Sequence, residues 1–207
     1  MPLKWLKAKD FGDGRLKFRR TLANKGKRVE PSQILEWLET RKWPYTWTPD
    51  FYELRDKALI SLLFLCCGRI GEVLRLTKEQ FKESKHFLIL KEYRVEKNQV
   101  NPIRDDWALP KRGKLAPFTH IVLEYLAMLP ESRIKLFEIK RSRAHQIVKH
   151  ITGKWCHWFR AMGEAYYMRM VFKEPVKAAS ALRLRRSDTL IEYVPFEWKD
   201  YEEQLSA

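Results

Sequence analysis

The first residues that could do chemistry follow a strongly apolar run. The run extends from Ala58 to Gly68, and Arg69 comes directly after it. Placing a guanidinium beside so apolar a segment costs free energy unless the charge has a partner or a function. Glu72 follows one helical turn later and can hold the Arg69 side chain. Taken alone, this spacing favours a purely structural ion pair.

A second pair, His157 and Arg160, is also one helical turn apart, on one face of a predicted helix. Arg160 can bind a phosphate with two hydrogen bonds, while His157 donates a third or shuttles a proton. One such His-x-x-Arg match is expected by chance in a basic chain. The nearby His145, His150 and Cys156 match no standard zinc spacing even with His157 included, so we predict no metal site.

The elements that must position these residues are mainly helical. Apolar residues recur at helical spacing in several segments, and Ser32, Asp50 and Ser142 are plausible helix caps. Gly153 is expected to stop the helix that Ser142 begins. One predicted helix starts at 31–32 and ends near 43–44. A second starts at 50 and continues from 69 to 77. The remaining predicted helices cover 118–129, 142–152, 155–172, 176–186 and 189–194.

The middle of the chain has a different pattern. Phe87–Leu90 and Tyr93–Val95 predict a strand, Asn98–Asp106 a turn, and Trp107–Pro110 a returning strand. The sequence therefore predicts a mainly α fold with a small antiparallel β-sheet, in the α+β class.

The charge is strongly polarised along the chain. The formal net charge is +15, and basic residues dominate both the first 30 residues and the tract from Arg133 to Arg186. We predict a basic N-terminal arm at 1–31, a central domain at 32–194 and an acidic tail at 195–207. This pattern predicts a polyanionic partner, with an unspecific basic surface as the alternative.

Composition excludes several classes of protein. A hydrophobic content of 45% argues against disorder, and no apolar run approaches the roughly 20 residues that cross a bilayer. The start of the chain lacks the pattern of a cleavable signal, and Cys66, Cys67 and Cys156 are typical of reduced thiols. We therefore expect a cytoplasmic protein with no membrane partner.

Three motifs in order resemble those of the tyrosine recombinases, the phage-integrase family. The segment Cys67-Gly68-Arg69-Ile70-Gly71-Glu72-Val73-Leu74-Arg75-Leu76 resembles the first arginine motif of that family, and His157–Arg160 resembles its His-x-x-Arg box. The segment from Leu184 to Tyr193 resembles the end that carries the nucleophile. The resemblance covers the chain from about Ser32 to its end, with a strand pair between the first two motifs. It implies that the domain at 32–194 is a catalytic domain, and that the chain is of prokaryotic, viral or plasmid origin.

This resemblance implies a role for each matching residue. Tyr193 would attack the scissile phosphate to form a 3′-phosphotyrosine, with Tyr201 as a reserve nucleophile. Arg69, Arg160 and Arg186 would stabilise the charge on the phosphate oxygens. His157 would assist proton transfer, and Lys97 would protonate the leaving oxygen, with Lys91 as the second choice for that acid. Arg186 stands where the family usually has His or Trp. Glu72 would support Arg69, and no metal, nucleotide or other cofactor is implied.

The resemblance also implies the partners. Double-stranded DNA is the expected substrate, contacted by Arg141, Arg143, Lys154 and Arg185. A homotetramer on DNA is expected, with a monomer possible in solution and the acidic tail docked on a neighbour. Two alternatives stay open: a non-catalytic DNA-binding module of recombinase origin, and a type IB topoisomerase.

Overall fold

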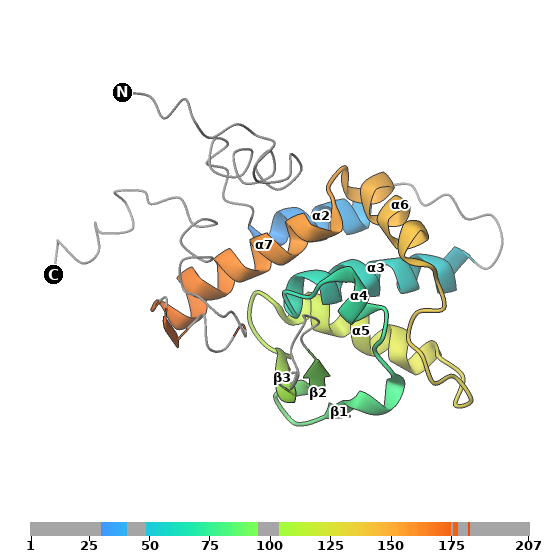
Figure 1. Ribbon diagram of the computed structural model, residues 1–207, viewed down its shortest axis with the longest axis horizontal. Coiled ribbons are helices and arrows are strands. Elements are labelled where there is room, and N and C mark those ends of the chain that lie inside the picture. Colours follow the sequence, from blue (N-terminus) through green and yellow to red (C-terminus); the bar gives the residue numbers. More distant parts are fainter. Residues whose placement is uncertain (1–29, 41–48, 95–103, 175, 178–181, 183–207) are drawn as a thin grey trace, which may run out of the picture. The chain divides into compact units, whose positions relative to one another are not determined.

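The computed structural model describes residues 30–40, 49–94, 104–174, 176–177 and 182. The chain divides into two compact units, residues 29–163 and residues 1–28 with 164–207. The predicted basic arm and acidic tail lie outside the described residues, apart from Glu30 and Pro31 at the end of the arm. Figure 1 labels the elements.

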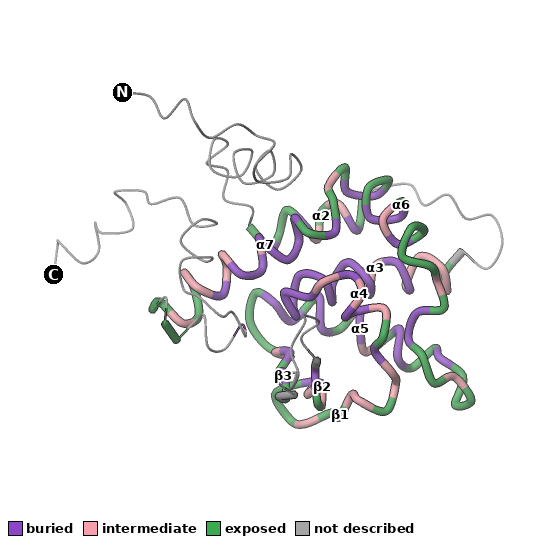
Figure 2. Tube along the Cα trace, in the orientation of Figure 1, coloured by how far each residue is buried: buried purple, intermediate pink, exposed green. Residues whose placement is uncertain are grey.

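Helix α3 (Pro49–Leu65) is the centre of the first unit. Every residue from Ala58 to Leu65 is buried, as expected of a helix that is apolar on all sides. Figure 2 shows this continuous burial along α3. Helix α5 (Ala116–Met128) packs beside α3, where the Phe64 and Phe118 rings lie 5.2 Å apart.

Three further helices complete the first unit. They are α2 (Pro31–Thr40), α4 (Ile70–Val73) and α6 (Arg141–Thr152). Figure 1 shows α2 and α6 on one side of α3 and α5, with the sheet on the other. Gly153 ends α6 in the left-handed conformation, at φ 69°, as the sequence predicted.

The sheet has three antiparallel strands, one more than the predicted pair. The strand β1 (Phe81–Glu83) precedes β2 (Phe87–Arg94) and β3 (Arg104–Pro110), in the spatial order β1-β2-β3. The predicted turn at 98–106 is therefore wrong at its end, because β3 already begins at Arg104. Thr77 and the short helix η2 (Lys78–Gln80) lead into β1.

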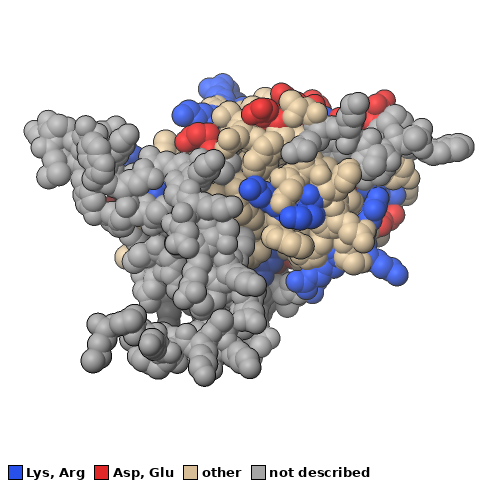
Figure 3. All heavy atoms as spheres, turned by 90° about the horizontal axis from the view of Figure 1, so that it is seen from above, with Lys and Arg blue, Asp and Glu red and all other residues tan. Residues whose placement is uncertain are grey.

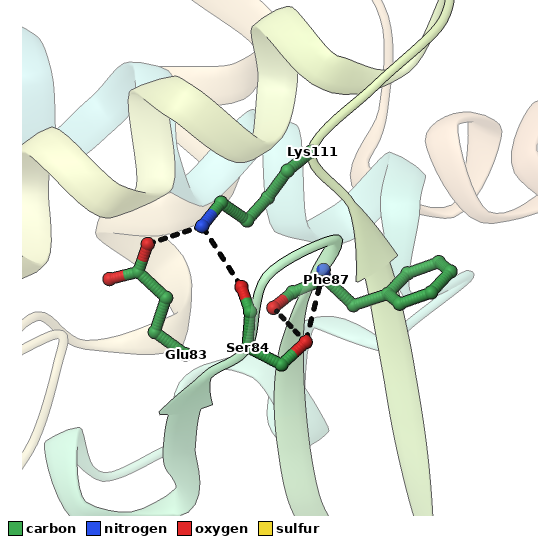
Figure 4. A network of polar contacts seen from close by, with 4 residues as sticks. All are labelled: Glu83, Ser84, Phe87 and Lys111. Carbon is green, nitrogen blue, oxygen red and sulfur yellow. Dashed lines mark hydrogen bonds and ion pairs between the residues drawn. The ribbon is translucent and has the colours of Figure 1, made fainter.

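The tight turn between β1 and β2 is held by a polar network (Figure 4). The Ser84 hydroxyl donates to the Phe87 carbonyl at 3.0 Å and accepts from its N–H at 3.2 Å. Lys111, just after β3, donates to the Ser84 carbonyl at 3.0 Å and pairs with Glu83. These contacts tie all three strands together at this end of the sheet.

The predicted helix starts need correction. Helix α2 begins at Pro31, α3 at Pro49 and α6 at Arg141, so Ser32, Asp50 and Ser142 lie inside first turns and are not caps. Proline fits the first helical position because it has no N–H to leave unpaired. The helix predicted from Arg69 to Thr77 is also shorter, since α4 ends at Val73.

Helix α7 (Cys156–Tyr166) carries the His-x-x-Arg box and continues as the π-helical turn η3 (Tyr167–Phe172). The predicted helix at 155–172 is therefore confirmed within a residue. In the second unit, Lys177 pairs with Glu174 at 2.9 Å and the Tyr167 and Phe172 rings stack. The helices predicted at 176–186 and 189–194 lie almost wholly outside the described residues.

Candidate phosphate-binding site

The end of α3 creates the backbone that presents Arg69. Cys67 adopts a positive φ of 48°, which ends the helix, and Arg69 then takes an extended conformation before α4. The Glu72 carboxylate closes this turn, because its Oε2 accepts the Arg69 N–H at 2.7 Å. Its Oε1 accepts from the Arg69 guanidinium at 2.8 Å. One carboxylate therefore orients both the backbone and the side chain of Arg69.

Arg160 reaches the same carboxylate from α7. Its guanidinium lies 3.7 Å from Glu72 Oε2, and only 8% of its side chain is exposed. Arg69 is 29% exposed and Glu72 4%. The fold thus brings together three of the predicted site residues, which come from two segments far apart in the sequence.

Two guanidiniums contact one buried carboxylate, in a place where water screens charges poorly. Arginine donors in such a place suit a phosphate, whose oxygens accept paired hydrogen bonds. Arg69 is the more exposed cation and therefore the one an anion can contact from solvent.

Gly163 explains how α7 can bring Arg160 so close to Glu72. A Cβ at this position would lie 2.3 Å from the Phe64 carbonyl oxygen and 2.8 Å from Cys67 Sγ. The α7 backbone therefore packs directly on the end of α3, just before the Arg69 turn. The sequence analysis did not single out Gly163. A glycine one turn after Arg160, inside a predicted helix, could have indicated close packing of the backbone there.

Replacing Gly163 with alanine is expected to destabilise the fold. Helix propensity alone would favour alanine by about 1 kcal/mol. The clash with backbone atoms outweighs this gain, and we expect a net loss of about 2 kcal/mol in the free energy of unfolding. Urea denaturation would measure it, with the exposed Ser142→Ala as control at near-zero change. A Gly163→Ala chain as stable as the parent would contradict the close approach.

His157 lies in the first turn of α7 and is exposed. It lies one turn before Arg160 on the same helix, but His157 is exposed whereas Arg160 is buried. Its role in proton transfer stays a prediction.

Of the two lysines predicted as candidate acids, Lys91 lies in the described part of the chain and Lys97 does not. Lys91 pairs with Asp106 across β2 and β3, and this hydrogen bond lowers the pKa of the Asp106 carboxyl. Lys97, the first choice for the acid, lies outside the described residues. Arg185, Arg186, Tyr193 and Tyr201 lie outside them as well.

The predicted DNA-contacting residues in and just after α6 differ in exposure. Arg141 and Arg143 are exposed in its first turn. Lys154 is half-buried, with its ammonium 5.4 Å from the Trp158 ring centre and 5.8 Å from that of Trp37. Figure 3 shows Lys and Arg side chains in small groups between uncharged atoms on one face of the molecule.

The three cysteines, Cys66, Cys67 and Cys156, are buried. Burial raises the pKa of the Cys156 thiol to about 12, so this sulfur is a poor nucleophile and metal ligand. Burial and the Arg141 charge lower the pKa of His145. In the described ranges, no three His, Cys, Asp or Glu side chains gather as metal ligands do.

No helix in the described part of the chain is both long and apolar enough to cross a membrane. Comparison with protein-family models gives no match, and neither does comparison with curated proteins. Among solved structures, the chain is similar to the XerH site-specific recombinase bound to its palindromic difH substrate in a post-cleavage complex. The TM-score is 0.63 at 14% sequence identity, covering 86% of this chain and 52% of that one.

This chain therefore spans about half the length of that recombinase. At this identity the likeness concerns the fold, which is mainly helical with one three-stranded antiparallel sheet. The predicted fold class, similar to a tyrosine recombinase catalytic domain, is confirmed.

Proposed function

We propose that this chain is a site-specific DNA recombinase or integrase that cleaves and rejoins DNA through a 3′-phosphotyrosine. The observation that carries the proposal is the convergence of Arg69 and Arg160 on the single Glu72 carboxylate. A positively charged, largely buried pair of arginines is suited to a phosphate whose charge grows during reaction. The similarity in fold to a recombinase solved with DNA supports the same function.

The proposed reaction needs no metal and no ATP. The Tyr193 oxygen attacks the scissile phosphorus, and the bond from phosphorus to the 5′ oxygen breaks. Lys97 protonates the leaving 5′ oxygen, and His157 assists proton transfer from the tyrosine. Arg69, Arg160 and Arg186 stabilise the phosphate oxygens. The phosphotyrosine keeps the bond energy, so attack by a 5′-hydroxyl restores the DNA.

The sequence that leads to Arg160 is consistent with DNA as partner. No acidic residue occurs between Glu138 and Glu164, a stretch that includes α6 and most of α7. Arg141, Arg143 and Lys154 lie here, and the proposed contacts extend to Arg185. Two or more chains, a tetramer in the family pattern, would hold two DNA sites together.

A covalent-trapping experiment tests this proposal. The chain would be incubated with nicked duplexes of randomised sequence, in chelator and without ATP, and protein–DNA adducts separated on a denaturing gel. We expect an adduct that is lost in Tyr193→Phe and kept in Tyr201→Phe. An adduct that instead requires Tyr201 would reassign the nucleophile. Salt-dependent DNA binding with no adduct in any variant would favour a non-catalytic binding module.

A further inference from the structure

The turn that joins α6 to α7 carries an exposed tryptophan (Figure 1). Trp155 lies between Gly153, which ends α6, and Cys156, where α7 begins. Trp155 is 56% exposed, whereas Trp107 and Trp158 are each 8% exposed. Covering so large an apolar ring is favourable in water. A single exposed apolar residue is common on protein surfaces, however, so the surroundings of the ring must indicate what covers it.

Hydrogen bonds fix the backbone on both sides of Trp155. The Thr152 hydroxyl donates to the Val148 carbonyl at 2.7 Å and accepts from the Lys154 N–H at 3.1 Å. The Trp155 carbonyl accepts from the Trp158 N–H at 2.9 Å, at the start of α7. A ring on a backbone held in this way loses little conformational freedom when a ligand binds to it.

Two lysines bring positive charge to this turn. The Lys149 ammonium lies over the face of the Trp155 ring, 4.7 Å from its centre. It also donates to the Gly153 carbonyl at 2.8 Å, and its other two N–H groups can donate to an anion. Lys154 is the residue directly before Trp155, and no acidic residue occurs from 139 to 163. The ring is therefore set in a basic stretch of the chain.

We propose that this turn binds a single-stranded segment of DNA. One base stacks on the Trp155 indole, and the neighbouring phosphates lie at Lys149 and Lys154. Aromatic side chains within a basic surface suit single strands, because every base offers a flat ring and every nucleotide a phosphate. An apolar protein segment would cover the indole but would bring no charge to the lysines. This inference rests on the proposed function, which makes DNA the partner.

The stacking requires a base that has left its duplex. Within a duplex both faces of a base are already stacked, so an indole can take only an unpaired base. A strand that has been cut and is moving to a new partner carries such bases. The turn at Trp155 would hold that strand, while Arg69 and Arg160 act on the phosphate. We therefore expect Trp155 to contribute to the binding of single strands and not of fully paired DNA.

The test measures equilibrium binding of two short strands with equal numbers of phosphates. One is a thymidine strand, and the other has the same sugars and phosphates without bases. We expect Trp155→Ala to bind the thymidine strand about tenfold more weakly than the parent, as is typical for loss of one stacked base. Its affinity for the strand without bases should stay close to the parental value. Equal loss on both strands, or no loss on either, would overturn the proposal.

Three further variants separate stacking from charge. Trp155→Phe keeps a smaller ring and should recover part of the preference for bases. Phe87→Ala removes another exposed ring, 44% exposed in β2, and should leave this preference unchanged. If Phe87→Ala acts like Trp155→Ala, the stacking is not a property of this turn and the proposal fails. Lys149→Gln should weaken binding of both strands and reduce the slope of log affinity against log salt by about 0.7. An unchanged slope would contradict the phosphate contact.

These outcomes are distinguishable from failure of the proposed function. If the parent binds the thymidine strand through Trp155 but forms no covalent adduct, the recombinase proposal fails and the stacking site stands. If the adduct forms while Trp155→Ala binds both strands as the parent does, only the stacking site fails. A parent that binds neither strand would refute the stacking site, whatever the trapping experiment shows.

Discussion

Replacing Arg69 with alanine is expected to slow formation of the covalent DNA adduct by about 10³-fold. Removing one neutral donor from a charge-stabilising site typically costs 10²–10³-fold in rate, and Arg69 is a charged donor. Arg69 is also the more exposed of the two arginines, so it is the one that can meet the phosphate first. Single-turnover cleavage of a nicked duplex, at saturating protein, measures the chemical step apart from binding.

Two variants control for charge and for shape. Arg112→Ala removes one positive charge from an exposed residue outside the cluster, and we expect a change of less than about threefold, a difference under 1 kcal/mol. Arg69→Lys keeps the charge but loses the paired donors, so it should recover only part of the rate. If Arg69→Ala cleaves within tenfold of the parent while still folded, the assignment of Arg69 to the phosphate is wrong.

The ion pair of Arg69 and Glu72 was predictable because its two residues are neighbours on one turn. Their spacing alone fits a structural pair, and the structure shows the pair formed at 2.8 Å. What local spacing could not show is that Arg160 joins the same carboxylate. That contact depends on Gly163 and the tight packing of α7 on α3, which are properties of the tertiary fold. The resemblance to a family had assigned Arg69 and Arg160 to one phosphate, but it did not predict that both contact Glu72.

In the sheet, the sequence predicted the two longer strands but not the bulge in β2 or the short strand β1. The strands around Phe87–Leu90 and Trp107–Pro110 were predictable from apolar, β-forming residues. The bulge at Glu92 was not, because it requires knowing that Tyr93 rather than Glu92 faces the core. Strand β1 was missed for a similar reason, since its three residues, Phe81–Glu83, are too short to show a period.

The predicted helix starts were wrong for a chemical reason. Ser32, Asp50 and Ser142 were predicted caps because their side chains can accept from the first free N–H groups. In the structure each helix begins one residue before its predicted cap, at Pro31, Pro49 and Arg141. At two of the three starts, proline's fixed φ makes it the better first residue.

Replacing Glu72 with glutamine is expected to have the largest effect on stability. The substitution keeps the size of the side chain but leaves two guanidiniums, one of them 8% exposed, without their shared carboxylate. Breaking a buried ion pair in this way costs about 3–5 kcal/mol. We expect the lower end, about 3 kcal/mol, because Arg69 is partly exposed to water. For a chain of this length that corresponds to a fall in melting temperature of roughly 6–12 °C.

Glu79→Gln is the matched control, because Glu79 lies seven residues on and is exposed. We expect its effect on stability to stay within about 0.5 kcal/mol. If the two substitutions lower the melting temperature equally, Glu72 does not hold the arginine pair together.

The same pair of variants tests whether the cluster is an anion site, independently of any reaction. With Glu72 neutralised, Arg69 and Arg160 lose the carboxylate that they share, so a bound sulfate should stabilise the folded chain in proportion to its occupancy. Sulfate also stabilises folded proteins in general by its exclusion from their surfaces, and Glu79→Gln reports that general effect at the same concentration. The rise in melting temperature with sulfate should therefore be largest in Glu72→Gln, smaller in the parent, and reduced to the general effect when Arg69 is also replaced by alanine. Equal rises in Glu72→Gln and Glu79→Gln would mean that the two arginines do not act together on an anion, and the phosphate assignment would lose its physical basis.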